Sequence, residues 1–192
     1  MHDVGVERVA VVGCIGAGKS TVARALGEIL GVEVFHLDRL WWQPSEYKIT
    51  GAASVAAHTM AEDEFLQLEK RLAAGEAWVI DSGVANIGIR LARADTVVFL
   101  DLQRWICAWR VIKRHNRPRP DYPEGVREGF GWMWLLLRWI RKTWPTERRP
   151  SVLSAIEEYG AGATVVHLRT RREVRSFLDG LGQGETAPDH LR

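Results

Sequence analysis

The stretch that decides the fold of this chain reads Gly13-Cys14-Ile15-Gly16-Ala17-Gly18-Lys19-Ser20. It matches the phosphate-binding pattern G-x-x-x-x-G-K-[ST] at every fixed position. Residues 9–12, just ahead of it, are a short apolar run rich in valine, which predicts a buried parallel strand. Residues 21–30, behind it, repeat apolar side chains at helical spacing, and Gly31 then predicts a helix end. Strand, glycine-rich loop and helix in this order are typical of a P-loop.

The chemistry of a phosphate site explains why the loop needs these residue types. Glycines let the backbone curl so that successive N–H groups face an anion, and the helix N-terminus adds partial positive charge. We therefore expect Lys19 to reach the β- and γ-phosphates of a nucleoside triphosphate and the Ser20 hydroxyl to ligate Mg²⁺. A glycine-rich turn that binds nothing is the alternative, and the complete pattern disfavours it. The predicted phosphate-binding residues are Gly13, Gly16, Ala17, Gly18, Lys19, Ser20 and Thr21.

Length and composition fit one globular domain. The chain has 192 residues, of which 46% are hydrophobic and 26% charged, so it can bury a sizeable core. Its first residues lack a basic-then-apolar leader pattern, and no apolar run reaches the length of a membrane span. Two cysteines, Cys14 and Cys107, lie far apart in the sequence without metal-ligand spacing. We expect a reducing, cytoplasmic setting, because a disulfide at Cys14 would obstruct the phosphate loop.

The near-neutral net charge of +2 hides a strong local asymmetry. Residues 103–149 contain twelve Lys or Arg against four Asp or Glu, so this segment carries +8 and the remainder −6. A basic block in a phosphate-binding protein can be a nucleotide lid, a nucleic-acid patch or a solvated surface.

The remaining segments alternate between expected strands and expected helices. Capping boxes, Thr59 with Glu62 and Thr170 with Glu173, predict two helix starts. Apolar strands that alternate with helices indicate an α/β fold with a parallel sheet covered on both faces. We expect one domain at residues 1–181, with a lid insertion at about 110–149 and a polar tail at 182–192. Strands are expected at residues 32–37, 77–80, 96–100 and 163–168, and helices at 59–74, 86–92 and about 171–179.

Three aspartates stand at the carboxyl ends of expected strands, where such sheets gather their ligands. Asp81 can hold a water on the Mg²⁺ ion that Ser20 ligates, so these two are the predicted metal residues. Asp38 follows the second strand and can accept a hydrogen bond or a proton from an acceptor hydroxyl. Asp101 can equally be functional or cap the next helix. The role of His36 stays open.

These residues together resemble the bacterial DNA topology modulation proteins, which are small adenylate-kinase-like P-loop proteins. The resemblance covers roughly residues 8–180. It implies a P-loop three-layer sandwich with a five-stranded parallel sheet in the order 2-3-1-4-5, an arginine-rich lid after the fourth strand, and ATP as the nucleotide. After Asp81 the chain reads Ser82-Gly83-Val84, where the family usually has Gly-Asn-Tyr. The stretches that carry the resemblance to this family are residues 13–21, 36–38, 78–81, 93–101 and 105–114.

A basic helix is expected to follow Asp101. Arg110, Arg114 and Arg117 recur at spacings of four and three, so a helix would stack them on one face, where they could converge on phosphate oxygens. Pro118 and Pro120 would end this helix. Mobile arginines of this kind neutralise the charge of a transferring phosphoryl group, and a solvated basic surface is the alternative.

Residues 130–144 hold four of the nine tryptophans and then turn basic. The favoured interpretation is a lid helix that packs on the core and on a neighbouring face with Trp105 and Trp109. Attachment to a membrane surface and stacking on nucleobases are the alternatives.

The sequence therefore predicts a P-loop kinase that transfers the γ-phosphoryl group of MgATP to a small acceptor, such as a nucleotide or nucleoside. Lys19, Asp38, Arg110, Arg114 and Arg117 are the predicted catalytic residues. The alternative function is that of a nucleotide-regulated DNA-binding protein, in which residues 103–149, with their net charge of +8, bind DNA phosphates. No recognised DNA-reading motif is present.

Overall fold

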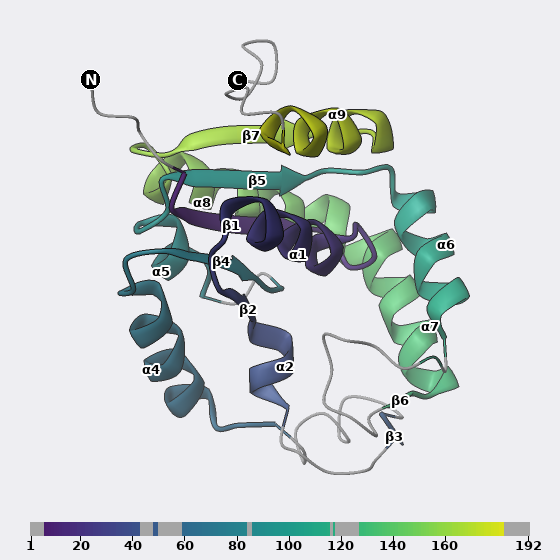
Figure 1. Ribbon diagram of the computed structural model, residues 1–192. Coiled ribbons are helices and arrows are strands. Elements are labelled where there is room, and N and C mark those ends of the chain that lie inside the picture. Colours follow the sequence, from purple (N-terminus) through teal and green to yellow (C-terminus); the bar gives the residue numbers. More distant parts are fainter. Residues whose placement is uncertain are drawn as a thin grey trace, which may run out of the picture.

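The computed structural model describes residues 6–42, 48–49, 59–83, 86–115, 117 and 127–182. Within these ranges, five parallel strands form one sheet in the order β2-β4-β1-β5-β7 (Figure 1). Counted along the chain among themselves, these strands follow the expected order 2-3-1-4-5. Their bounds are β1 Arg8–Gly13, β2 Val34–His36, β4 Trp78–Asp81, β5 Thr96–Leu100 and β7 Thr164–Leu168.

The pairing of the strands brings their carboxyl ends to one edge of the sheet. Val11 lies opposite Asp81 of β4, and His36 of β2 lies opposite the same aspartate. On the other side of β1, Gly13 lies opposite Leu100 of β5. The central strands are fully buried, as their unbroken apolar runs predict.

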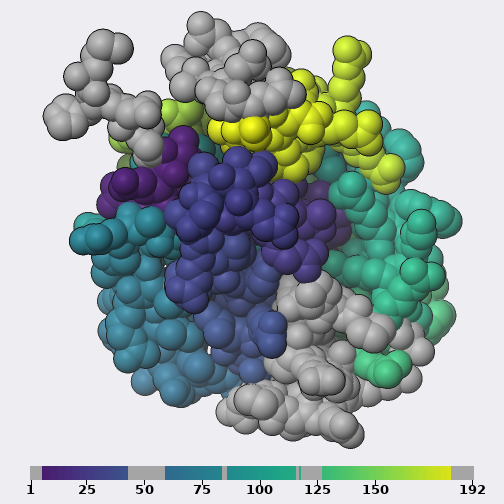
Figure 2. Space-filling view, viewed as in Figure 1, coloured from purple at the N-terminus to yellow at the C-terminus, as the bar shows by residue number. Residues whose placement is uncertain are grey.

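Helices cover both faces of the sheet. Figure 1 shows α1 and α9 in front of the strands and α8 behind them, and Figure 2 shows α1 filling the middle of the front face below α9. The chain is thus a three-layer α/β sandwich. The helix bounds are α1 Lys19–Leu30, α2 Leu37–Trp41, α4 Glu62–Ala73, α5 Ile87–Leu91, α6 Arg104–Arg114, α7 Phe130–Arg138, η1 Trp139–Arg148, α8 Arg149–Tyr159 and α9 Arg171–Gly182.

Several predicted element ends are confirmed and others are wrong. Gly31 ends α1 in the left-handed conformation, and the Thr170–Glu173 capping box opens α9 through two reciprocal hydrogen bonds. The second strand ends at His36, because Leu37 begins the short helix α2. Thr59 does not cap a helix: it forms an isolated antiparallel bridge with Trp42, and α4 begins at Glu62.

The segment after β5 departs from the expected packing. Trp105 and Trp109 of α6 are 67% and 55% exposed, and α6 instead buries Cys107 and Val111. The prediction that residues 130–144 pack on the core is confirmed by the buried side chains of Met133, Ile140 and Trp144, whereas Trp105 and Trp109 stay largely exposed. Of the four tryptophans in residues 130–144, Trp144 is buried.

A proline determines how α6 meets the wide-turned helix η1. In a regular α-helix the amide of residue 145 would donate to the carbonyl of Arg141, but Pro145 has no amide hydrogen. Arg104 Nη1 of α6 donates to that carbonyl at 3.1 Å. The π-helical turns of η1 accommodate the missing amide of Pro145, and the carbonyl of Arg141 that this amide would have bonded is bonded by α6 instead.

Two short strands, β3 (Lys48–Ile49) and β6 (Arg127–Glu128), pair in parallel apart from the main sheet. Pro118, Pro120 and the tail beyond residue 182 lie outside the described residues. In the part of the chain that the structure describes, no helix is long and apolar enough to cross a membrane.

Candidate active site

The glycine-rich loop is held in its curled shape from two sides. Gly16 has a φ of 80°, and a Cβ there would lie 2.4 Å from the carbonyl oxygen of Cys107 in α6. A Cβ at Gly13 would lie 2.5 Å from the carbonyl oxygen of Leu100 in β5. Neither position accepts a larger residue without displacing backbone, so the loop depends on glycine at both.

Lys19 and Ser20 form the first turn of α1, at the positive end of its helix dipole. The Lys19 side chain is 9% exposed, and its Nζ donates to the carbonyl of Cys14 at 3.3 Å. The ammonium group is thus folded back over the loop. This position brings its charge to the place where the pattern predicts phosphates.

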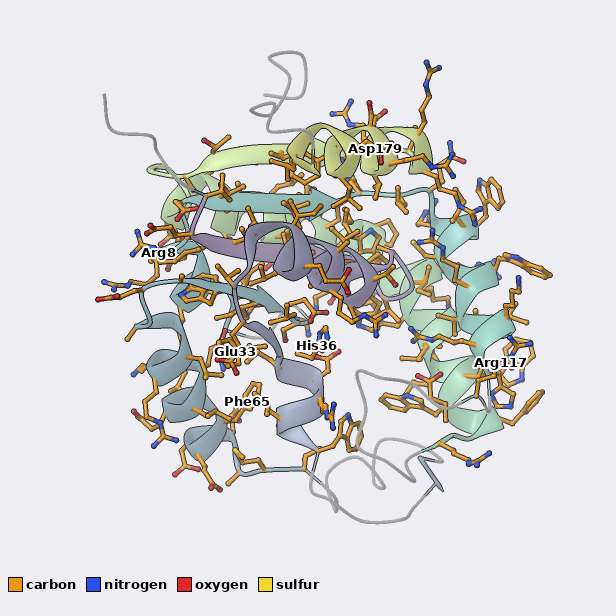
Figure 3. All side chains as sticks on the ribbon, in the orientation of Figure 1. Arg8, Glu33, His36, Phe65, Arg117 and Asp179 are labelled. Carbon is orange, nitrogen blue, oxygen red and sulfur yellow. The ribbon has the colours of Figure 1, made fainter. Side chains whose placement is uncertain are left out.

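Ser20, Asp81 and His36 meet at the carboxyl ends of β4 and β2. The Ser20 hydroxyl donates to Asp81 Oδ2 at 2.8 Å, and His36 Nδ1 contacts Oδ1 of the same carboxylate. Asp81 is buried, so these two partners fix its orientation. Figure 3 shows His36 at the junction of β2 and α2, below the first turn of α1.

Asp38 lies in the first turn of α2, beside the loop that follows β4. Its Oδ1 accepts hydrogen bonds from the Gly83 amide at 3.3 Å and the Ser82 hydroxyl at 3.4 Å. The structure therefore brings Asp38 and the residues after Asp81 together on the β2 side of the P-loop. This is the side on which the sequence predicted the acceptor.

A buried ion pair supports that loop from behind. Arg90 of α5 and Glu69 of α4 are both fully buried and pair through Nη1 and Oε1. Arg90 Nη2 also donates to the carbonyl of Gly83 at 2.6 Å. Burial raises the pKa of Glu69, and the charge of Arg90 opposes that rise. The pair ties two helices to the backbone beside Asp38.

The three predicted lid arginines gather near the P-loop but differ in their contacts. Arg110 Nη1 donates to the carbonyls of Ala17 at 2.5 Å and Gly16 at 3.3 Å. Burial and the nearby charge of Arg171 lower the pKa of Arg110. Arg114 donates to buried Glu128 at 3.3 Å. Arg117 is exposed beyond the end of α6, at the right of Figure 3.

These arginines line one cavity of about 800 Å³ that opens beside the loop. Its other walls come from the start of α1 and from α9. The charges along it are mainly positive, so it suits a phosphate-bearing ligand. The charged residues on its described walls are Arg110, Lys113, Arg114, Arg117, Arg171, Arg175 and Asp179.

Asp101 does not cap α6. Its carboxylate accepts hydrogen bonds from Arg149 Nη2 at 2.7 Å and from Arg149 Nε, which is shared between the two oxygens at 3.0 and 3.1 Å, and it contacts His167 Nε2 at 3.0 Å. The helix cap position of α6 is occupied by Gln103. Asp101 therefore joins the ends of β5 and β7 to the start of α8.

The donor set of this site fits Mg²⁺ together with nucleotide phosphates. A serine hydroxyl and a buried carboxylate are the hard oxygen donors that this ion prefers, and it normally completes its shell with phosphates and water. Within the described ranges, no group of three or more His, Cys, Asp or Glu residues is placed to hold a metal by itself. Ser20 and Asp81 are the residues that would hold the ion.

Sequence reasoning missed three features of this site. The contact of His36 with Asp81 depends on β2 pairing with β4, which no local pattern reveals. The Arg90–Glu69 pair joins residues from two helices 21 positions apart in the sequence, and no local pattern shows that these helices meet. The third feature is the part of the cavity wall that α9 supplies. Its Arg171 and Arg175 are four residues apart and so share a helix face, which is the sequence signal that could have indicated them.

Comparisons with known proteins show the fold but no family. No family model and no curated protein matches the chain. Among solved structures, it is similar to shikimate kinase from Acinetobacter baumannii in complex with shikimate, at 21% identity over 93% of this chain and 92% of that one, with a TM-score of 0.54. It is also similar to a candidate kinase from Chloroflexus aurantiacus, at 13% identity over 95% and 100% of the two chains, with a TM-score of 0.53. The chain therefore has the fold of the P-loop kinases, and the resemblance to the DNA topology modulation proteins stays a prediction.

Proposed function

We propose that this protein is an ATP-dependent phosphotransferase that moves the γ-phosphoryl group of MgATP to a small acceptor, such as a nucleotide or nucleoside. The observation that carries the proposal is the 2.8 Å hydrogen bond between Ser20, at the end of the glycine loop, and Asp81, at the end of the adjacent strand. It places a hydroxyl and a carboxylate beside Lys19, as phosphoryl transfer with Mg²⁺ requires.

The P-loop and the residues next to it have separate roles in binding the nucleotide and its metal ion. Loop amides and Lys19 bind and orient the phosphates, while Ser20 and Asp81 hold Mg²⁺, which when bound supplies positive charge to the phosphate oxygens. His36 positions the Asp81 carboxylate through its ring nitrogen. Arg110, Arg114 and Arg117 supply further positive charge from the cavity wall, and Arg110 and Arg114 exchange their present protein partners for phosphate.

The acceptor belongs next to Asp38 in this proposal. The Asp38 carboxylate can take the proton of an attacking hydroxyl, and the Ser82 hydroxyl and Gly83 amide orient that carboxylate. The shikimate kinase that shares this fold was solved with shikimate, which is a small hydroxylated acid. A hydroxylated small molecule is consistent with the polar groups that α2 and the loop after β4 present.

The alternative of a nucleotide-regulated DNA-binding protein stays a hypothesis. In the described part of the basic segment, Arg104, Arg110 and Arg149 each bond to another group of the protein. Part of the +8 charge is therefore used to join elements internally, which favours the kinase interpretation.

The test is ADP release from MgATP across a panel of nucleotides, nucleosides and small hydroxylated acids. One acceptor class is expected to stimulate the rate strongly, and Lys19→Ala is expected to lower that stimulated rate by about 10²-fold or more, because it removes a charge aimed at the developing phosphate charge. Phosphate appearing on the acceptor, followed by mass spectrometry, separates transfer from hydrolysis.

Lys70→Ala is the matched control, because Lys70 is an exposed lysine of α4. It is expected to turn over like the wild type. The proposal would be wrong if Lys19→Ala kept the full rate, or if no member of the panel became phosphorylated while duplex DNA bound in a salt-sensitive way.

A further inference from the structure

The only two cysteines of the chain meet at the P-loop, although 92 residues separate them in the sequence. Cys14 is the second residue of the loop, and Cys107 lies in the second turn of α6. Both are 0% exposed and belong to the same buried cluster, where Cys107 Sγ donates to the carbonyl of Leu102 at 3.9 Å. Two buried thiols on adjoining elements at a phosphate loop are not needed for the proposed transfer reaction.

The backbone around the thiols is equally close. The carbonyl oxygen of Cys107 lies only 2.4 Å from the position that a Cβ atom on Gly16 would take. One helical turn later, Arg110 donates to the carbonyls of Gly16 and Ala17. The loop and α6 are thus held together by close backbone packing at Cys107 and by hydrogen bonds one helical turn later.

We propose that Cys14 and Cys107 are an oxidation site, at which a hydroperoxide such as hydrogen peroxide forms a disulfide that ties α6 to the P-loop. The Cys107 thiolate attacks the peroxide, the O–O bond breaks, and sulfenic acid and hydroxide form. The Cys14 thiol then attacks the sulfenic sulfur, and water leaves. In total, two thiols and one hydrogen peroxide give one disulfide and two waters.

The surroundings favour Cys107 as the attacking thiol. The hydrogen bond from the Cys14 thiol, together with the charges of Lys19 and Arg110, lowers the pKa of Cys107. The same hydrogen bond and burial raise the pKa of Cys14, which therefore serves as the resolving thiol. Because both sulfurs are buried, the peroxide reaches them only when α6 lifts from the loop, so the reaction is expected to be slow.

The disulfide would hold the loop and Arg110 in their present contact. The proposed transfer requires Arg110 to leave the carbonyls of Gly16 and Ala17 and turn to the nucleotide phosphates. A covalent link one turn away on α6 restricts that movement. This consequence rests on the proposed function, whereas the formation of the disulfide does not.

The experiment treats the reduced full-length protein with hydrogen peroxide. The intact mass is expected to fall by the mass of two hydrogen atoms, both cysteines are expected to resist alkylation, and digestion is expected to yield one peptide that joins residues 14 and 107. Dithiothreitol is expected to reverse all three changes. Turnover with the best acceptor is expected to fall about 10²-fold on oxidation, the size of effect that a small misplacement of a catalytic group causes, and to return on reduction.

Cys107→Ala and Cys107→Ser are the control variants, and either suffices if the other folds poorly. Each should keep its turnover in peroxide, because Cys14 then lacks a partner. The oxidation site is overturned if the wild-type cysteines gain oxygen atoms separately or stay open to alkylation without a joined peptide. If the joined peptide forms and turnover is unchanged, the inhibitory effect is overturned. If it forms in a protein that never phosphorylates an acceptor, the proposed function fails and the oxidation site stands.

Discussion

Asp81 engages both of its carboxylate oxygens, one with Ser20 and one with His36. The P-loop pattern predicted Ser20, and the end of the third expected strand predicted Asp81. The expected order 2-3-1-4-5 places the strand of His36 beside the strand of Asp81, but it does not give the register that sets these two residues opposite each other, so their contact was not predicted. A histidine that orients a metal-holding carboxylate acts on the ion through that carboxylate.

We therefore expect His36→Ala to raise the Mg²⁺ concentration needed for half-maximal turnover by about 10–100-fold, the usual effect of losing a partner of a metal-holding residue. The rate at saturating Mg²⁺ should change much less. His36→Asn should recover part of the loss, because its amide can still donate to Asp81. Turnover measured against Mg²⁺ concentration checks this, and an unchanged requirement in His36→Ala would exclude the positioning role.

At the scale of elements, long apolar runs were predictable and element ends were not. The strands at 96–100 and 163–168 are present because unbroken apolar runs must be buried on both faces of a sheet. Leu37 looks like a continuation of such a run, yet it is the buried first residue of α2. Thr59 has the spacing of a capping box, but tertiary pairing with Trp42 overrides this local preference.

The cluster at Asp101 joins β5, β7 and α8, and it makes stability depend on pH. Burial opposes ionisation of Asp101, but the hydrogen bonds from Arg149 and His167 prevail and lower its pKa. Because the folded pKa lies below the unfolded value, near about 3.9, the carboxylate stabilises the fold above that value. This contribution is lost as the pH falls through the folded pKa.

We expect Arg149→Gln to lower the free energy of unfolding by about 1 kcal/mol at pH 7, as for a partly exposed pair. The difference from the wild type should shrink as the pH falls from about 4, the unfolded pKa, toward the lowered pKa of folded Asp101, because the carboxylate that Arg149 binds is protonated over this range. Urea unfolding at a series of pH values measures this. If the difference in the free energy of unfolding between the two proteins stayed constant down to pH 3, Arg149 would act through packing alone.

Across the whole molecule, the P-loop and a parallel sheet covered on both faces were predictable from patterns within short segments, whereas the expected sheet order came from the resemblance to the DNA topology modulation proteins. The sequence did not predict how α6 packs against the P-loop. Arg110, Arg114 and Arg117 line one cavity, but their spacing does not show that Arg110 binds carbonyls more than ninety residues away. The thiol pair depends on the same long-range packing, which residue spacing does not encode.

The nucleotide should stabilise the whole fold, because the loop that we propose binds it joins β1 to α1 at the centre of the sheet. A ligand that binds only the folded protein adds about 2.7 kcal/mol to the free energy of unfolding at 100 times its dissociation constant. We expect this gain for the wild type and for Lys70→Ala in MgATP, measured by urea unfolding. Lys19→Ala at the same MgATP concentration should gain much less, because its weaker binding lowers the ratio of ligand to dissociation constant. An equal gain in Lys19→Ala would place the bound nucleotide away from the P-loop.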